Sequence, residues 1–165
     1  MLKPRNTSSV WKLIIAILAC EAIGFTSGLI GSAAMNTWFD NLQKPSWNPP
    51  AYLFAPVWTL LYALMGIAFW LIWKNETPAA NKRSAYVAFA LQLFLNFWWS
   101  IIFFRFQSPF FALIEILMLL AIILLTIFHF SKISKTAAYL LVPYVLWVSF
   151  ASFLNYTLWS LNNSH

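Results

Sequence analysis

Five stretches of apolar residues constrain the fold of this chain more than any other feature. A helix that crosses a lipid bilayer needs about 20 mostly apolar residues, and each stretch has roughly that length between charged residues, prolines or polar clusters. Polar and apolar residues do not alternate in them, as they would in the strands of a membrane β-barrel. We therefore predict an all-α integral membrane protein, a single domain consisting of a bundle of five transmembrane helices. The predicted spans are approximately residues 10–30, 51–73, 85–104, 109–130 and 137–159.

The composition excludes other classes of protein. Of the 165 residues, 62% are hydrophobic and 8% are charged, whereas about 25% of the residues in an ordinary soluble domain are charged. The single cysteine, Cys20, cannot form an intrachain disulfide. Lipid must therefore provide part of the solvent. The aromatic share of 19%, with ten tryptophans, exceeds what anchoring in the membrane interface requires.

Basic residues are unevenly distributed between the two ends of the predicted bundle. Lys and Arg are enriched in the cytoplasmic segments of membrane proteins. Eight of the ten basic residues fall on the side of the amino terminus, and Lys44 and Arg105 fall on the other side. We therefore expect a cytoplasmic amino terminus, with the first loop and the carboxyl terminus outside. The net charge of +6 is then explained by topology and by attraction to anionic membrane lipid, and no nucleic acid is expected as a partner.

The first connection, residues 31–50, is long and unusually apolar. It contains Trp38, Phe39 and Trp47 together with three prolines, but only two charged residues. A loop that is exposed only to water does not need large apolar side chains, so two interpretations remain. The loop is either a lid that packs over the mouth of the bundle or an aromatic anchor in the membrane interface.

Two carboxylates fall inside predicted spans. Glu21 lies near the middle of the first span, where an ionised carboxylate costs about 2.5 to 3.5 kcal/mol, so it needs a partner, a proton or a water-filled cavity. A face of small residues, on which another helix can pack closely, adjoins Glu21 and consists of Cys20, Gly24, Gly28 and Ser32. Both a hydrogen-bonded structural acid and a proton relay are compatible with Glu21. Glu115 lies near the start of the fourth span, and its side chain is expected to reach outward.

Three predicted spans carry large rings and a few amides at helical spacing, so these side chains share one face of each helix. The amides must point into the bundle because lipid offers them no hydrogen-bond partner. The faces are Trp58, Tyr62, Met65 and Phe69 on the second span, Gln92, Asn96, Trp99 and Phe103 on the third, and Tyr144, Trp147, Ala151, Leu154, Asn155 and Leu158 on the fifth. Pro143 is expected to kink the fifth span. Aromatic walls with sparse polar groups indicate a pocket for a flat, apolar ligand. A core filled by the same rings is the alternative.

The sequence lacks the motifs of common catalytic and cofactor sites. His129 and His165 are isolated from each other and from Cys20, so no metal-ligand cluster is expected. No phosphate-binding loop, dinucleotide-binding glycine motif, nucleophile elbow or zinc-protease motif occurs. Conventional hydrolase, nucleotidase and redox-cofactor functions are therefore unsupported, and neither a metal nor an obligatory cofactor is expected.

A series of short motifs resembles a known family in order and spacing. The motifs are Trp38-Phe39, Lys44-Pro45-Ser46-Trp47-Asn48-Pro49-Pro50, Pro56-Val57-Trp58-Thr59, Leu61-Tyr62, Met65-Gly66, Ala90-Leu91-Gln92-Leu93, Leu95-Asn96, Pro143-Tyr144 with Trp147, Phe150-Ala151 and Leu154-Asn155-Tyr156. Together they resemble the TspO/MBR family of tryptophan-rich sensory proteins and translocator proteins, which are related to the peripheral benzodiazepine receptor. The resemblance extends from about Trp38 to Trp159, and the first span matches only in character.

The resemblance implies a five-helix membrane receptor, often a homodimer, with a ligand pocket beneath the first loop. It implies porphyrins as ligands, namely protoporphyrin IX and haem, and similar flat hydrophobic molecules, in tetrapyrrole handling or a stress response. The ligand-binding residues that it implies are Trp38, Phe39, Pro49, Phe54, Trp58, Tyr62, Asn96, Trp99, Trp147, Ala151 and Leu154. The short amino-terminal arm favours a bacterial plasma membrane as the location.

Other functions stay open at this point. Some bacterial relatives are reported to degrade protoporphyrin in the light, and the resemblance then makes Trp58 and Trp147 the catalytic candidates. Transport of tetrapyrroles or other lipophilic molecules would need alternating access, and no inverted repeat supports it. A purely structural protein would bind no small molecule saturably. Mammalian relatives have a basic residue shortly after the tyrosine that matches Tyr156, but residues 157–163 contain none here, so cholesterol is not expected as a ligand.

Overall fold

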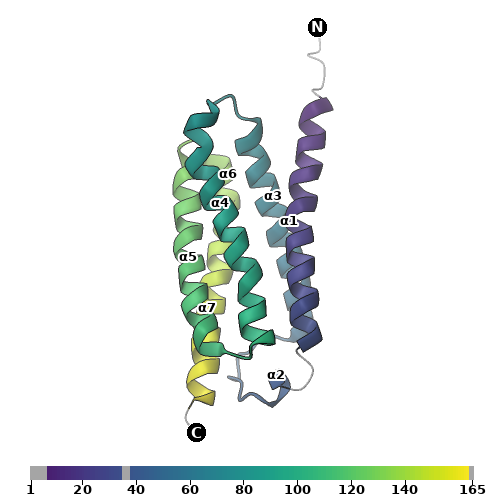
Figure 1. Cartoon of the computed structure of the whole chain (residues 1–165), viewed down its shortest axis with the longest axis vertical. Helices are drawn as coiled ribbons and strands as arrows, with labels where there is room; N and C mark the ends of the chain where they lie inside the picture. Colours follow the sequence, from purple (N-terminus) through teal and green to yellow (C-terminus); the bar gives the residue numbers. More distant parts are fainter. Residues whose placement is uncertain (1–6, 35–37, 164–165) are drawn as a thin grey trace.

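The protein is a bundle of long helices that lie side by side (Figure 1). The structure, a computed structural model, describes residues 7–34 and 38–163, and these ranges contain no β-strand. The long helices are α1 (Thr7–Ala34), α3 (Phe54–Lys74), α4 (Ala79–Ser100), α5 (Pro109–Ser131) and α7 (Val142–Asn162). Within these described ranges, five segments are long and apolar enough to cross a membrane. The predicted fold class is therefore confirmed.

Four short elements extend or connect these helices. They are α2 (Trp38–Asn41), the 3₁₀ turn η1 (Ala51–Leu53), the π-helical turn η2 (Ile101–Arg105) and α6 (Lys135–Leu140). The fifth predicted span is interrupted near the proline, because α6 and α7 are separated at Leu141 and Pro143 lies in the first turn of α7. Proline has no backbone N–H and is tolerated in a first turn, where that group would have no partner within the helix.

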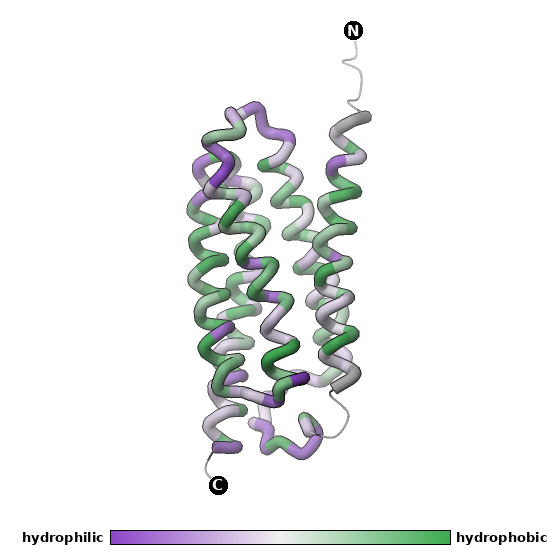
Figure 2. The backbone as a smooth tube through the Cα atoms, viewed as in Figure 1, coloured by the Kyte–Doolittle hydropathy of each residue, from purple (hydrophilic) through white to green (hydrophobic). Residues whose placement is uncertain are grey.

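Apolar side chains cover both the inside and the outside of the bundle. Figure 2 shows hydrophobic residues along the middle of the long helices and hydrophilic residues mainly at the ends. Met65 and Ile123 are fully buried in the core, whereas Leu18, Phe111 and Leu146 are each more than 60% exposed. Exposed leucine and phenylalanine in such numbers are expected where lipid is the solvent.

The helices do not contribute equally to the core. α5 packs against α4, α6 and α7, and α3 packs against α1 and α6. α1 stands at one side of the bundle (Figure 1) and makes most of its contacts with α3. Because α1 contacts the other helices less, part of its surface borders the cavity described below.

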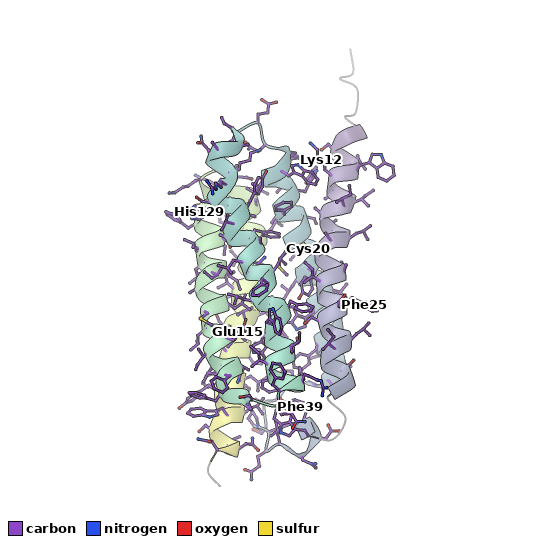
Figure 3. All side chains as sticks on the ribbon, in the orientation of Figure 1. Lys12, Cys20, Phe25, Phe39, Glu115 and His129 are labelled. Carbon is purple, nitrogen blue, oxygen red and sulfur yellow. The ribbon has the colours of Figure 1, made fainter. Side chains whose placement is uncertain are left out.

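Basic side chains gather at the end of the bundle opposite α2. Lys12 lies over the ring of Trp73, and Lys74 lies over the ring of Trp70. Lys82 is only 5% exposed, and its ammonium group donates to the backbone carbonyls of Trp73 and Asn75. The carbonyl of Trp73 lies in the last turn of α3 and that of Asn75 directly follows it, where a cation satisfies acceptors that the helix leaves unpaired. Figure 3 shows Lys12 and His129 near this end and Phe39 near the other.

The face of small residues predicted on α1 packs against another helix over only part of its length. A Cβ atom added at Gly24 would lie 2.1 Å from the ring of Tyr62, whereas one added at Gly28 would meet nothing within 4 Å. The close approach of α1 to α3 continues at Gly66, where an added Cβ would lie 2.6 Å from the backbone Cα of Ile17. The two helices thus meet around Gly66 and diverge toward Gly28.

We expect Gly66→Ala to destabilise the bundle and Gly28→Ala to leave it intact. The backbone of Ile17 blocks the new methyl group at position 66, and overpacking of this kind costs about 1 to 3 kcal/mol. At position 28 the methyl group has room, and alanine favours the helix by about 0.5 to 1 kcal/mol. Thermal unfolding of the purified proteins in one detergent compares the two variants. Equal melting temperatures would contradict this account of the contact between α1 and α3.

A candidate ligand-binding cavity

The first connection packs across one end of the bundle. We call residues 38–50, which include α2, the lid. Trp38 and Phe39 of α2 make edge-to-face contacts with Phe103, with ring centroids 5.7 and 6.1 Å apart, and Phe39 also contacts Phe104. Aromatic pairs of this geometry stabilise a contact beyond the area they bury. The start of the lid is therefore attached to η2.

The second half of the lid is attached to α7. The ring of Trp47 stacks on Phe153 with centroids 5.3 Å apart and also contacts Phe150. The backbone N–H of Gln43 donates to the Asn162 side-chain oxygen at 2.9 Å, and the Asn162 amide nitrogen donates back to the Gln43 carbonyl at 3.0 Å. The lid thus has fixed contacts on two sides of the bundle.

A cavity of about 560 Å³ lies beneath the lid. Its lining comes from α1, the lid, α3, α4 with η2, α5 and α7, and it is predominantly apolar. The polar side chains in the lining are those of Glu21, Ser27, Ser32, Asn48, Thr59, Tyr62, Asn96, Ser100 and Asn155 together with the indoles of Trp58 and Trp99. An apolar cavity with a few polar groups is typical of a small-molecule site.

Most of the residues that the sequence singled out for ligand binding lie together in this lining. They are Phe39, Pro49, Phe54, Trp58, Tyr62, Asn96, Trp99, Ala151 and Leu154. Trp38 and Trp147 do not line the cavity, and each packs against a ring that does, Trp38 against Phe103 and Trp147 against Phe54. Of the two tryptophans for which the resemblance implies photochemistry, only Trp58 borders the cavity. Ligand contact by all eleven residues stays a prediction.

The π-helical turn η2 shapes one wall of the cavity. The N–H of Phe106 donates to the carbonyl of Ile101 at 3.0 Å, five residues earlier, so this turn is wider than an α-helical turn. Both Phe103 and Phe104 line the cavity. Gln107 then adopts a positive φ of 52°, which ends the helix before α5 begins. Turns of this type are frequent at functional sites, but no pattern in the sequence predicted this one.

A chain of hydrogen bonds links three helices at the cavity wall. The hydroxyl of Tyr62 on α3 donates to the Asn96 side-chain oxygen on α4, and the Asn96 amide nitrogen donates to the Tyr144 hydroxyl on α7 at 2.6 Å. All three residues are at most 4% exposed. The prediction that Asn96 faces into the bundle is therefore confirmed, and its amide has partners on both neighbouring helices.

A second set of hydrogen bonds lies closer to the lid. The indole N–H of Trp99 donates to the Asn155 side-chain oxygen at 3.1 Å, and the Asn155 amide nitrogen donates to the carbonyl of Pro109 at 2.8 Å. These bonds join α4, α7 and the start of α5. Because they orient Trp99, they also fix one flat wall of the cavity.

The prediction that Glu115 reaches outward is wrong. Glu115 is 4% exposed, and both of its carboxylate oxygens are buried without a hydrogen-bond partner. It lies within the bundle on α5 (Figure 3), on the same face as the buried residues Ala112 and Leu119. The spacing of three and four residues between these positions is the signal that could have placed Glu115 inside.

Sequence reasoning also missed the contribution of α1 to the lining. Glu21, Gly24, Phe25 and Gly28 all border the cavity, although the sequence pattern assigned the small residues to a helix contact. The open space beside Gly28 shows that this residue borders the cavity and does not pack closely against another helix. A pattern of small residues cannot distinguish these two roles, because it permits close packing without requiring it.

Comparison with known proteins agrees with the motifs in the sequence. Residues 16–160 match the model of the TspO/MBR family. The chain belongs to this family. It is 43% identical over 150 residues to the tryptophan-rich protein TspO of Chlorobaculum tepidum, covering 91% of this chain and 95% of that protein. It is 41% identical to the TspO of Archaeoglobus fulgidus, covering 93% and 99%, and 38% identical to the human translocator protein, covering 76% and 75%.

Membership of the TspO/MBR family makes this an integral membrane protein with five candidate spans. The family is one of membrane proteins that bind ligands. Within it, the cavity under the lid is the candidate functional site of this chain.

We expect Tyr144→Phe to destabilise this TspO/MBR protein, because the change removes the hydroxyl that accepts from the buried Asn96 amide. Such bonds in membrane proteins average about 0.6 kcal/mol and reach about 1.7 kcal/mol. Tyr139→Phe is the matched control, since Tyr139 is 71% exposed. Thermal unfolding in detergent should show a lower melting temperature for Tyr144→Phe only. A shift of equal size in both variants would argue against the hydrogen-bond chain.

Proposed function

We propose that this protein is a membrane receptor for porphyrins, such as protoporphyrin IX and haem, and for similar flat hydrophobic molecules. The observation that carries the proposal is the ring-lined cavity of about 560 Å³ beneath the lid. Small-molecule sites usually measure roughly 300 to 1,000 Å³, and apolar and aromatic side chains dominate their walls. Trp58 and Trp99 offer flat faces on which a macrocycle can stack.

The cavity suits recognition of the macrocycle better than ligation of a metal at its centre. No histidine, methionine or cysteine occurs among the described residues of the lining. These are the side chains that most often ligate haem iron. We therefore infer that stacking and exclusion of water, and not coordination of iron, supply the affinity for either ligand.

Replacement of Trp58 should weaken porphyrin binding. Trp58→Ala removes a half-buried ring from the cavity wall, and we expect the dissociation constant for protoporphyrin IX to rise about tenfold, which corresponds to about 1.4 kcal/mol. Trp11→Ala is the control, because Trp11 is 66% exposed and does not line the cavity. The measurement is a titration of the purified protein that follows the absorbance band of the porphyrin.

The two variants also test where the ligand lies. Trp11→Ala should bind protoporphyrin IX like the unaltered protein. If Trp58→Ala and Trp11→Ala bind with the same affinity, the porphyrin occupies another part of the molecule. If no variant, nor the unaltered protein, shows saturable binding, the proposed receptor function is wrong.

We further infer that the end of the bundle with Lys12 and Lys74 faces the cytoplasm and that the lid faces outward. The uneven distribution of basic side chains supports this orientation. In a variant that lacks Cys20, single cysteines replace Ser46 in the lid or Asn81 at the other end, both of which are exposed. A membrane-impermeant maleimide should label Ser46→Cys in intact cells and Asn81→Cys only after lysis. The reverse pattern would invert the topology.

A further inference from the structure

The cavity is electrically asymmetric. Among its described lining residues Glu21 is the one with a charged side chain, and no Lys, Arg or His lines it. Glu21 lies in the middle of α1, about 20 Å along the helix axis from the end at Ala34, given a rise of 1.5 Å per residue. A carboxylate is therefore present in the wall of a membrane-embedded cavity, away from the lid.

Glu21 has no partner within the described part of the chain. No hydrogen bond or ion pair joins its carboxylate to another described residue. The ring of Tyr62 packs against Gly24, on the next turn of α1, but the Tyr62 hydroxyl donates to Asn96. An unpartnered carboxylate at this depth is unfavourable, so a ligand that supplies a cation or an N–H group here would gain affinity.

The other polar groups of the lining mostly have partners already. The hydroxyls of Ser27 and Thr59 donate to the backbone carbonyls of Phe97 and Ala55 at 3.1 and 2.9 Å. The amide nitrogen of Asn48 donates to the carbonyl of Pro49, whereas its side-chain oxygen is buried without a partner.

The groups that stay free in the lining differ in charge. The free acceptors are the Glu21 carboxylate and the Asn48 oxygen, and the free donors, those of Trp58 and Ser100, are neutral. The cavity therefore offers a negative acceptor to a ligand and no positive donor.

The lid carries one basic side chain, Lys44, and one acidic side chain, Asp40. The ammonium group of Lys44 lies 4.7 Å from the centre of the Phe39 ring and donates to the backbone carbonyl of Asp40 at 3.1 Å. Phe39 lines the cavity, so Lys44 is separated from it by one aromatic ring. The site thus has a negative group in its wall and a positive group at the lid.

We propose that Glu21 selects the charge of the ligand. The group that lies against Glu21 is a protonated amine or an N–H donor of a flat, apolar molecule, and any carboxylates of the ligand lie toward Lys44 at the lid. A tetrapyrrole with carboxylates on one edge binds with that edge outward. The inference rests on the proposed receptor function and adds an orientation and a preferred ligand charge to it.

Three flat probes of different charge test this selectivity. Protoporphyrin IX carries two carboxylates, its dimethyl ester carries none, and 9-aminoacridine is a flat cation at neutral pH. Glu21→Gln should weaken binding of 9-aminoacridine about tenfold, since a charge-assisted hydrogen bond is replaced by a neutral one. Binding of the dimethyl ester should stay within about twofold, which is under 0.5 kcal/mol. Glu21→Asp keeps the charge and should retain binding of the cation.

Matched variants separate this role from general effects of charge. Glu115→Gln also removes a carboxylate from within the bundle, but Glu115 does not line the cavity, so no affinity should change. Lys44→Gln should weaken binding of protoporphyrin IX and leave its dimethyl ester unaffected. Lys135→Gln, on an exposed residue at the start of α6, is the control for Lys44.

The possible results distinguish the two proposals. If the dimethyl ester binds but 9-aminoacridine does not, or if Glu21→Gln binds all three probes like the unaltered protein, charge selection by Glu21 is wrong and the receptor function stands. If the unaltered protein binds neither porphyrin, the receptor function itself fails. Loss of cation binding in Glu21→Gln, with retention in Glu21→Asp and Glu115→Gln, supports the inference.

Discussion

Polar side chains inside a membrane-spanning bundle are stabilised by partners within the protein, because lipid offers none. The rest of the structure depends on this constraint. The chain from Tyr62 through Asn96 to Tyr144 joins α3, α4 and α7, and the bond from Trp99 to Asn155 joins α4 and α7 again nearer the lid. Each bond orients an aromatic ring as well as an amide. Helix association and the placement of the cavity walls thus have the same physical cause.

The cavity exists because α1 packs against α3 over only part of its length. α1 approaches α3 closely where Gly66 meets the backbone of Ile17, and it leaves open space beside Gly28. The lid closes one end of that space through ring contacts with η2 and α7. In the receptor function that we propose, the ligand binds mainly by apolar and aromatic contact, and the few polar groups in the wall set its orientation. Glu21 matters for that reason, since it adds charge to a wall that is otherwise neutral.

Sequence reasoning succeeded where the chemistry of a single side chain specifies its surroundings. Gln92 and Asn96 had to point inward, and both are buried. It failed for Glu115, because a carboxylate near a helix end can extend to the membrane interface, whereas the spacing from Ala112 places this one on the buried face. Trp147 differs in another way. It lies on the inner face of α7 as expected, yet it packs against the ring of Phe54 and does not line the cavity. The spacing of residues along a helix specifies the direction in which a side chain leaves the helix axis. It does not specify which of several neighbouring rings borders the cavity.

The sequence by itself determined the number of helices, their inward faces and the family. These depend on run length, on a period of 3.6 residues and on ordered motifs, all of which are local properties of the chain. Only the tertiary structure decided that a cavity remains, that η2 presents both Phe103 and Phe104 to it, and that Glu21 borders it while Glu115 does not. These features depend on the separation and rotation of whole helices. Packing among many side chains sets both quantities, so no single segment encodes them.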